Sequence, residues 1–316
     1  MRTIHARLWC AGCVLLAAVI AGAPQVRASV DGFGRFTDAD VLLVVAPHPD
    51  DETLCCAGAI QRARAAGARV AIVWITSGDG FELDAHVVEH RLFTGTQGLL
   101  ELAGLRMQEA ARAAQLLGVA PAQQFFLGYP DGGIAHLLSE NHDLPYRSPH
   151  TGVGAVPYAQ AFLPGAAYTG ASLEQNLRAL IERVQPTWVL APTPLDEHED
   201  HRATGEFVMR TMHGLGHLER VRYWIVHGGI GWPWPRGLHP QEALVPPSHA
   251  RALPWQDFML LPAERDQKAT AIGLYETQMR LTSSFMLSFV KRNEIYSAAP
   301  LPAASVEQHG GSNQPP

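Results

Sequence analysis

Two clusters in this chain combine histidine with carboxylates, and each directly follows an apolar run. Residues 48–52 read His-Pro-Asp-Asp-Glu after the run 41–46, and residues 196–201 read Asp-Glu-His-Glu-Asp-His after the run 188–191. Two imidazoles and a carboxylate are donors that a catalytic zinc takes, with one coordination position left for water. The leading hypothesis is therefore a metal-dependent hydrolase.

The first cluster taken alone is also compatible with an ordinary strand-to-helix turn. Proline punctuates such turns, Asp caps the helix, and Glu favours its first turn through the helix dipole. However, a cap needs one Asp, whereas here a His and two acidic residues recur with a second pair, His198-x-x-His201, after a later apolar run. The two clusters together favour a metal site.

The elements that must position these clusters alternate in type along the chain. Buried strands are predicted at 41–46, 69–76, 124–128, 187–192 and 221–227, and connecting helices at 52–66, 104–118 and 172–185. Asp50 or Asp51 would cap the first helix. This alternation predicts an α/β fold, Rossmann-like, with a mostly parallel sheet and helices on both faces. Both clusters would then meet at the carboxyl edge of the sheet, where such folds bind ligands.

Three stretches interrupt the alternation and are rich in Gly, Pro, His or aromatic residues: 79–101, 132–170 and 228–262. Loops of this length in a compact domain are usually functional or disordered. We expect them to be insertions at the carboxyl edge that form the walls of a substrate cleft. Helical spacing returns over 262–279.

The ends of the chain have their own composition. Residues 1–28 resemble a secretory signal, with basic residues before the apolar stretch 8–23 and a Val-Arg-Ala cleavage site. That stretch is short for a spanning helix. We therefore expect an exported protein, periplasmic or secreted, with one domain over 29–296, and a disordered tail over 297–316.

Composition limits the partners. Charged residues make up 17% of the chain and the net charge is −6, against about 25% charged residues in an average soluble protein. With no cluster of Lys or Arg, nucleic acid and anionic membranes are not expected as partners, nor is stable membrane insertion. Cys55 and Cys56 are adjacent, which disfavours a disulfide between them. We expect both to be small buried hydrophobic residues.

The motif Ala46-Pro47-His48-Pro49-Asp50-Asp51-Glu52 with a downstream His-x-x-His resembles the LmbE/PIG-L family of zinc-dependent N-acetylglucosaminyl deacetylases. Weaker family motifs follow in the same order: Arg106-x-x-Glu109, Gly128-Tyr129-Pro130-Asp131-Gly132, and Lys268-x-x-Ala271-x-x-x-Tyr275-x-Thr277-Gln278. Thr277 stands where the family more often has Ser. The long insertions are a further departure and bear on the substrate.

The resemblance implies a role for each matching residue. It makes His48, Asp51 and His201 the zinc ligands, Asp50 the general base, and His198 the group that faces the reacting carbonyl. By the same resemblance Arg106 and Asp131 contact sugar hydroxyls; the alternative for Arg106 is an exposed helix residue. The physical chemistry agrees, because zinc lowers the pKa of a bound water toward about 7 and a neighbouring carboxylate can accept its proton. The implied reaction is hydrolysis of an N-acyl group, acetyl in the first instance, from an N-acetylglucosamine-type sugar.

Other functions must be weighed against this one. The substrate could be another small N-acyl amide, or the chain could be a non-catalytic carbohydrate-binding protein, although a binding protein has no need of Asp50. Residues 86–90 match the His-x-x-Glu-His pattern of inverted zinc peptidases, but the match is short and lies in a predicted loop. His227-Gly228-Gly229 resembles an esterase loop, yet the chain has no Gly-x-Ser-x-Gly nucleophile motif. Trp232, Trp234 and Trp255 could stack on a sugar or pack an insertion.

Overall fold

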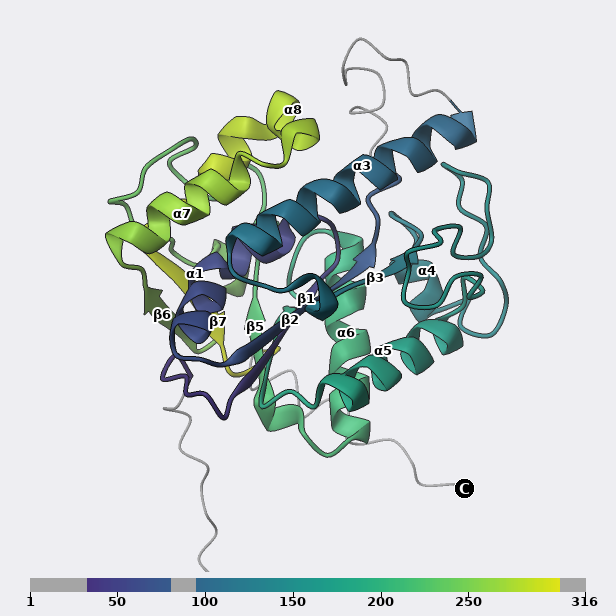
Figure 1. Cartoon of the computed structure of the whole chain (residues 1–316), viewed down its shortest axis with the longest axis horizontal. Helices are drawn as coiled ribbons and strands as arrows, with labels where there is room; N and C mark the ends of the chain where they lie inside the picture. The colour runs from purple at the N-terminus through teal and green to yellow at the C-terminus, as the bar shows by residue number, and fades with distance from the viewer. Residues whose placement is uncertain (1–32, 81–94, 302–316) are drawn as a thin grey trace, which may run out of the picture. The chain divides into compact units, whose positions relative to one another are not determined.

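A seven-stranded sheet in the order β3-β2-β1-β4-β5-β7-β6 forms the centre of the fold (Figure 1). The computed structural model describes residues 33–80 and 95–301. β1 to β5 are parallel to one another, whereas β7 is antiparallel to both β5 and β6. The prediction of an α/β fold with a mostly parallel sheet is confirmed.

The strands are β1 Val41–Ala46, β2 Arg69–Thr76, β3 Gln124–Tyr129, β4 Trp188–Pro192, β5 Val221–Trp224, β6 Trp255–Met259 and β7 Asn293–Ser297. The α-helices are α1 Asp51–Ala65, α3 Gly95–Leu116, α4 Ile134–Leu138, α5 Gly170–Val184, α6 Glu199–Gly214, α7 Pro262–Ile272 and α8 Glu276–Leu287. Short 3-10 helices span Pro121–Gln123, Leu218–Arg220 and Ser248–Ala250. Among the described residues, no helix has both the length and the hydropathy of a transmembrane span.

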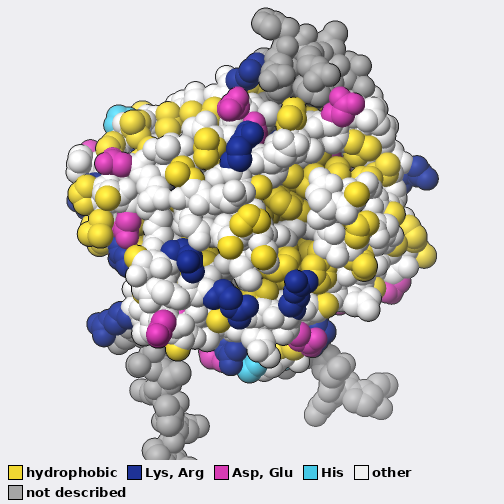
Figure 2. Space-filling view, viewed as in Figure 1, with side chains coloured by type: hydrophobic (Ala, Val, Ile, Leu, Met, Phe, Trp, Pro, Cys, Tyr) yellow, Lys and Arg dark blue, Asp and Glu magenta, His cyan; other side chains and the backbone are white. Residues whose placement is uncertain are grey.

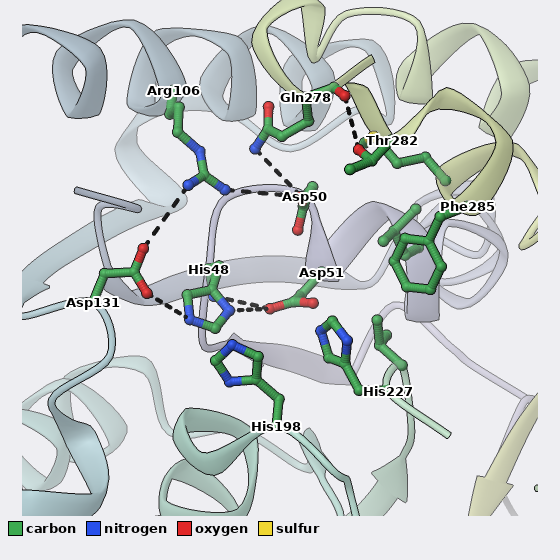
Figure 3. A pocket seen from close by; sticks show the side chains of 13 residues that line it. His48, Asp50, Asp51, Arg106, Asp131, His198, His227, Gln278, Thr282 and Phe285 are labelled. Atoms are coloured by element: carbon green, nitrogen blue, oxygen red, sulfur yellow. Dashed lines mark hydrogen bonds and ion pairs between the residues drawn. The ribbon is translucent and has the colours of Figure 1, made fainter. Parts of the chain in front are cut away.

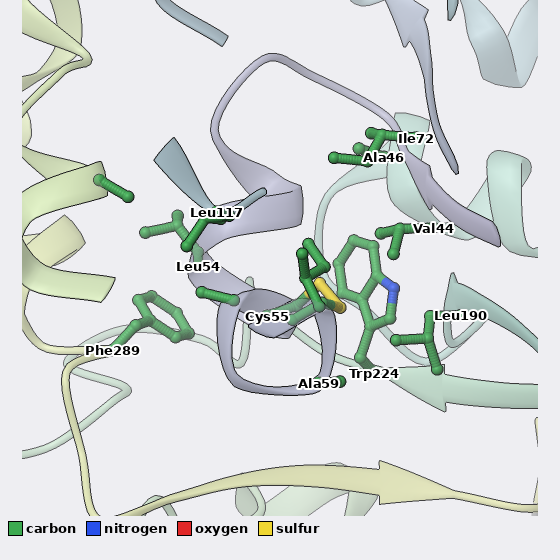
Figure 4. Packing of buried hydrophobic residues seen from close by; sticks show 14 of the residues in the cluster. Val44, Ala46, Leu54, Cys55, Ala59, Ile72, Leu117, Leu190, Trp224 and Phe289 are labelled. Carbon is green, nitrogen blue, oxygen red and sulfur yellow. A yellow bond between two sulfur atoms is a disulfide. The ribbon is translucent and has the colours of Figure 1, made fainter. Parts of the chain in front are cut away.

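Both faces of the sheet are buried, as a parallel sheet requires. Leu42 and Val44 of β1 point into an apolar cluster shared with α1 and with residues near the C-terminus, part of which is shown in Figure 4. Leu43 and Val45 point into the opposite cluster, which contains side chains of α5 and α6. On the face seen in Figure 2, hydrophobic side chains gather in the middle, with Lys, Arg, Asp and Glu side chains spread around them.

The strand order reverses between β1 and β4. Leu43 of β1 lies opposite Ala71 of β2 on one side and Val189 of β4 on the other. The loops after β1 and β4 therefore leave the same edge of the sheet side by side, which is where ligands bind in open α/β sheets. These two loops carry the two polar clusters of the sequence.

The C-terminal third departs from the predicted elements. The spacing over 262–279 predicted one helix, but the chain forms α7 and α8, separated by a break that contains Tyr275. β6 lies within the predicted loop 228–262, and β7 includes Ser297, which was assigned to the tail. The remaining tail, 302–316, and the predicted signal, 1–28, lie outside the described residues.

The prediction that Cys55 and Cys56 remain unpaired is wrong. Their sulfur atoms are joined by a disulfide bond of 1.99 Å within α1 (Figure 4). Sequence adjacency was taken as a barrier to bonding, but the Cα atoms of the two residues are 3.8 Å apart and both side chains are buried in the same apolar cluster. Their burial as small hydrophobic residues agrees with the prediction.

Candidate metal centre

His48, Asp51 and His201 converge at the carboxyl edge of the sheet. Asp51 Oδ2 lies 3.3 Å from His48 Nδ1 and 3.2 Å from His201 Nε2, and these two ring nitrogens are 3.3 Å apart. A tetrahedral zinc with ligand bonds of about 2.0–2.2 Å separates its ligand atoms by roughly 3.3–3.5 Å. The triangle of two nitrogens and one oxygen therefore fits one face of such a site in both spacing and donor chemistry.

The ring of His48 is held from its other side by two carboxylates. Its Nε2 lies 3.1 Å from Asp200 Oδ2 and 3.2 Å from Asp131 Oδ1. Asp200 also accepts hydrogen bonds from the backbone N–H groups of Gly132 and Ile134, at 2.7 and 3.0 Å. A proton held on Nε2 leaves Nδ1 as the lone-pair donor, and carboxylate partners of this kind orient metal-binding histidines.

His201 has an equivalent partner in Asp196. Its Nδ1 lies 3.2 Å from Asp196 Oδ2, which also accepts hydrogen bonds from the backbone N–H groups of Val226 and His227, at 2.9 and 3.0 Å. The carboxylate is thus fixed by the loop after β5. It leaves His201 Nε2 to face Asp51 and His48.

Asp50 occupies a strained position in the turn between β1 and α1. Its φ is 126°, a value that L-amino acids rarely adopt and that costs of order 1–3 kcal/mol. Asp50 or Asp51 was expected to cap α1. Asp50 does precede the helix, but its side chain accepts no hydrogen bond from the helix backbone. The strained backbone instead turns this carboxylate into the cavity, 3.3 Å from the amide nitrogen of Gln278.

Residues far along the chain hold this turn in place. Gln278 Nε2 donates to the carbonyl of Pro49 at 2.9 Å, and Arg106 Nη2 approaches the same oxygen at 3.4 Å. The hydroxyl of Tyr275 donates a hydrogen bond to the carboxylate of Glu52. Glu109 accepts a hydrogen bond from the backbone N–H of Thr277 at 3.0 Å, which ties α3 to α8. Two of the weaker sequence motifs, 106–109 and 268–278, therefore support the 47–52 turn.

Arg106 is not an exposed helix residue. Its side chain is buried, with Nη1 donating to the carbonyl of Gly78 at 2.8 Å and lying 3.9 Å from Asp131 Oδ2. Asp50 Oδ2 is 3.9 Å from Nη2. Arg106 and Asp131 thus line the same cavity, on the opposite side of His48 and Asp51 from His227 and Phe285 (Figure 3).

His198 caps the N-terminus of α6, and the hydrogen bond of its side chain defines the tautomer of the neutral ring. Its Nδ1 accepts a hydrogen bond from the backbone N–H of Asp200 at 3.2 Å, so the neutral ring carries its proton on Nε2. Burial, reinforced by His48 and His201, lowers the pKa of His198 to about 4. His198 is therefore a neutral hydrogen-bond donor at neutral pH.

The carboxylates around the site have divergent pKa values. Burial and the neighbouring Asp51 raise the pKa of Asp50 well above its ordinary value. Burial acts in the same direction on Asp51, but His201 and His48 outweigh it and hold the pKa of Asp51 well below the usual range. Burial opposes charge on His201, yet Asp196 and Asp51 raise its pKa to about 9. The cluster thus favours positive charge at its centre, which a divalent cation can supply.

Two adjoining cavities open at this edge. The inner one, of about 180 Å³, is lined by His48, Asp50, Asp51, Leu54, Arg106, Asp131, His198, Val226, His227, Gln278, Thr282, Phe285 and Met286. The outer one, of about 740 Å³, shares four of these residues and adds side chains from 229–236 and α8.

Among the described residues, the 228–262 insertion supplies cleft walls as expected. Its residues Gly229, Ile230, Trp232 and Arg236 line the outer cavity, whereas no described residue of 132–170 lines either cavity. Two buried tyrosines instead hold the 132–170 insertion against the rest of the domain. The hydroxyl of Tyr158 donates to Asp79 at 2.9 Å, and that of Tyr168 donates to the carbonyl of Gly128 at 3.2 Å. Most of 79–101, including the motif 86–90, lies outside the described residues.

The tryptophans of the third insertion have separate roles. Trp255 lies in β6 and donates to the carbonyl of Ala250 at 2.7 Å, so it packs the insertion. Trp232 packs edge-on against Phe289 and also lines the outer cavity. Trp234 is 75% exposed and lines neither cavity.

The sequence of residues 43–212 matches the PIG-L family, described as GlcNAc-PI de-N-acetylase. The chain belongs to this family. Over 169 residues it is 31% identical to a 1D-myo-inositol 2-acetamido-2-deoxy-alpha-D-glucopyranoside deacetylase of Saccharomonospora viridis, covering 51% of this chain and 53% of that protein. The deacetylase of the same name from Nakamurella multipartita is 31% identical over 188 residues, covering 54% of each chain. The chain thus spans about half the length of these PIG-L relatives.

Solved structures share the PIG-L fold described above. The N,N'-diacetylchitobiose deacetylase from Pyrococcus horikoshii aligns with a TM-score of 0.51 and 17% identity over 85% of this chain and 86% of that one. The zinc-inhibited form of teicoplanin deacetylase Orf2 aligns with a TM-score of 0.53 and 18% identity over 81% of this chain and 97% of that one. At these identities the likeness establishes the fold.

His227 is a cavity histidine to which sequence reasoning gave no role at the metal site. His227 follows β5, lines both cavities and lies with its ring centroid 4.6 Å from that of His201. Ligand atoms of Asp51, His201 and His227 lie within 4.8 Å of one another. Burial lowers the pKa of His227 to about 3. Its position directly after an apolar run was the available signal, but the sequence offered only an esterase interpretation.

Proposed function

We propose that this PIG-L protein hydrolyses the N-acyl group, acetyl in the simplest case, of an N-acetylglucosamine-type sugar with one zinc ion as cofactor. The observation that carries this proposal is the triangle of His48 Nδ1, Asp51 Oδ2 and His201 Nε2, with edges of 3.2–3.3 Å, beside the carboxylate of Asp50. Family membership and the acetamido-sugar deacetylases among the relatives support the choice of substrate class.

His48, Asp51 and His201 would hold the metal, which supplies Lewis acidity toward the amide carbonyl and lowers the pKa of water. Asp50 is the base in this proposal: it lines the inner cavity, and its raised pKa suits a group that accepts a proton from the attacking water. Its strained turn keeps the carboxylate aimed into the cavity, which avoids reorganisation during the reaction.

His198 serves as the hydrogen-bond donor to the tetrahedral oxyanion. Because Nδ1 accepts the backbone N–H of Asp200, Nε2–H is the group available to substrate. A donor fixed before the reaction stabilises developing charge at little cost in reorganisation. Arg106 and Asp131 are the proposed contacts for the sugar hydroxyls, on the opposite side of the ligand triangle from Phe285 (Figure 3).

The test is the release of free amine from a panel of methyl glycosides and disaccharides of N-acetylglucosamine, N-acetylgalactosamine and N-acetylmannosamine. The proposal expects turnover of the gluco-configured amides, with acetate formed in equal amount. Arg106→Lys should raise KM for the sugar more than it alters metal content. Absence of amine release from every member of the panel by the metal-loaded protein would contradict the proposal.

We also propose that the protein is exported, on the pattern of residues 1–28. Expression of the full chain followed by cell fractionation and N-terminal sequencing tests this. Cleavage after residue 28, with the mature chain outside the cytoplasm, is the expected result. An uncleaved chain in the cytoplasm would contradict it.

A further inference from the structure

We infer that the substrate's N-acyl chain is longer than acetyl, and that the chain lies in the outer cavity. This inference rests on the proposed hydrolysis of an N-acylated amino sugar. It concerns the acyl side of the amide, which the metal triangle alone does not define.

The two cavities meet on the far side of the metal-ligand triangle from Arg106. This triangle is formed by His48, Asp51 and His201. Figure 3 shows Arg106 and Asp131 on one side of His48 and Asp51, and His227 and Phe285 on the other. The outer cavity begins at the latter side, because His198, His227, Thr282 and Phe285 line both cavities. A substrate that reaches from one cavity to the other therefore passes the ligand triangle.

Amide geometry decides which part of the substrate points outward. The amide is planar and normally trans, so the nitrogen substituent and the acyl chain leave the carbonyl in opposite directions. With the sugar at Arg106 and Asp131 and the carbonyl at the triangle, the acyl chain points toward His227 and Phe285. An acetyl methyl would end near this junction and leave the outer cavity unfilled.

The outer cavity is chemically suited to an alkyl chain. Its lining includes Ile230, Trp232, Leu281 and Phe285, and its volume is about 740 Å³. The two charged lining residues have partners of their own: the guanidinium carbon of Arg236 lies 4.9 Å from the centroid of the Phe285 ring, and Glu197 Oε1 lies 3.7 Å from His249 Nδ1. Four large apolar side chains therefore face an occupant, beside the polar residues His198, His227, Thr282 and Ser284. Burying a chain of methylene groups against these apolar side chains is favourable.

The wall of the outer cavity is fixed by the fold. Trp232 Nε1 donates to the carbonyl of Val245 at 2.9 Å, and Gly237 N–H donates to the carbonyl of Ser284 in α8 at 2.9 Å. The ring of Trp232 packs so closely on Gly228 that a Cβ at this position would lie 2.6 Å from it. The part of the wall that contains Trp232 is therefore preformed, which reduces the entropic cost of binding.

The experiment compares the hydrolysis of three substrates by the metal-loaded protein. They are the methyl glycosides of N-acetylglucosamine and N-octanoylglucosamine, and the octyl glycoside of N-acetylglucosamine. Free amine gives kcat/KM for each. We expect the N-octanoyl compound to exceed the N-acetyl compound by at least about tenfold, and the octyl glycoside to gain less than about threefold. The double variant Ile230→Asn/Leu281→Asn should bring the octanoyl advantage below about threefold and leave N-acetyl hydrolysis unchanged.

Leu144→Asn is the matched control, because Leu144 is an exposed leucine that lines neither cavity; it should retain the octanoyl advantage. Hydrolysis of the N-acetyl compound with no gain for N-octanoyl would overturn this inference and leave the proposed function standing. A gain confined to the octyl glycoside would also overturn it, since the outer cavity would then take the aglycone. No hydrolysis of any compound would reject the proposed function and this inference together.

Discussion

Asp196 Oδ2 lies 3.2 Å from Nδ1 of His201, so a carboxylate fixed by the loop after β5 orients a histidine of α6. The same oxygen accepts two backbone N–H groups, and Oδ1 accepts the N–H of His198 at 2.9 Å. Asp196 thus links three parts of the site. Partners of this kind commonly tune the metal affinity of the histidine that they hold.

Asp196→Asn should weaken zinc binding by roughly 10–100-fold. Every orientation of the new amide places its NH2 group against at least one donor and removes the negative charge that supports His201. Competition with a chelator of known affinity measures the change. Glu199→Gln, which removes the same charge from an exposed position on α6, should bind zinc as the parent protein does, and equal affinity in both variants would rule out the role of Asp196.

Asp50→Asn and Asp51→Asn are neighbouring substitutions that should have different effects. Asp50→Asn keeps the shape of the side chain but not its basicity, so zinc should remain bound while kcat falls by roughly 10²–10⁴-fold. Asp51→Asn should instead reduce zinc content. Metal analysis and kcat on the same samples decide between the two, and equal metal loss in both variants would mean that base and ligand have been assigned incorrectly.

Asp79 should make folding stability depend on pH. Burial and the nearby Asp131 raise its pKa to about 6 from 3.8. Protonated Asp79 is therefore favoured by the fold, so its stabilising contribution is complete below pH 3.8 and is lost as the pH rises through 6. The loss is on the order of 3 kcal/mol.

Asp79→Asn removes this titration and can still accept from the backbone of Asp131 while donating to Tyr158, the partners that Asp79 has now. Urea unfolding between pH 5 and 8 should show the variant gaining stability relative to the parent as the pH rises. Groups that titrate in both proteins cancel in this difference. A difference that stays constant over the whole range would contradict the assignment.

Trp232 and Trp234 should differ in their effect on stability. Trp232 packs on Phe289 and donates to Val245, so Trp232→Ala should cost roughly 1–3 kcal/mol, less than a fully buried tryptophan. Trp234 is largely exposed, and Trp234→Ala should stay within about 0.5 kcal/mol. Equal Tm values for the two variants would show that Trp232 does not anchor the wall.

The parallel half of the fold was predictable because its strands are continuous apolar runs. β1 and β2 have the predicted bounds, since every residue from Leu42 to Ala46 and from Val70 to Thr76 is buried. β7 was missed because its buried residues include polar Asn293 and Glu294. Glu294 is buried through a 2.8 Å bond from Lys268 and backbone N–H groups of α1, a partnership that sequence periodicity does not reveal.

The same distinction holds within the site. His48 and His201 could be proposed as ligands because each follows an apolar run in a recognisable motif. The orienting roles of Asp196 and Asp200 could not be derived, because their partners are backbone N–H groups from 132–134 and 226–227, and only the folded chain places them there. Pairings across such sequence distances depend on tertiary structure.

A metal titration of amine release from an N-acylated glucosaminide tests the proposed zinc site most directly. We expect chelator-treated protein to be inactive, activity to return in proportion to added zinc up to about one ion per chain, and His201→Ala to gain neither bound zinc nor activity over the same titration. Full turnover by the metal-free protein, or zinc-restored activity in His201→Ala equal to that of the parent, would rule out the proposed site.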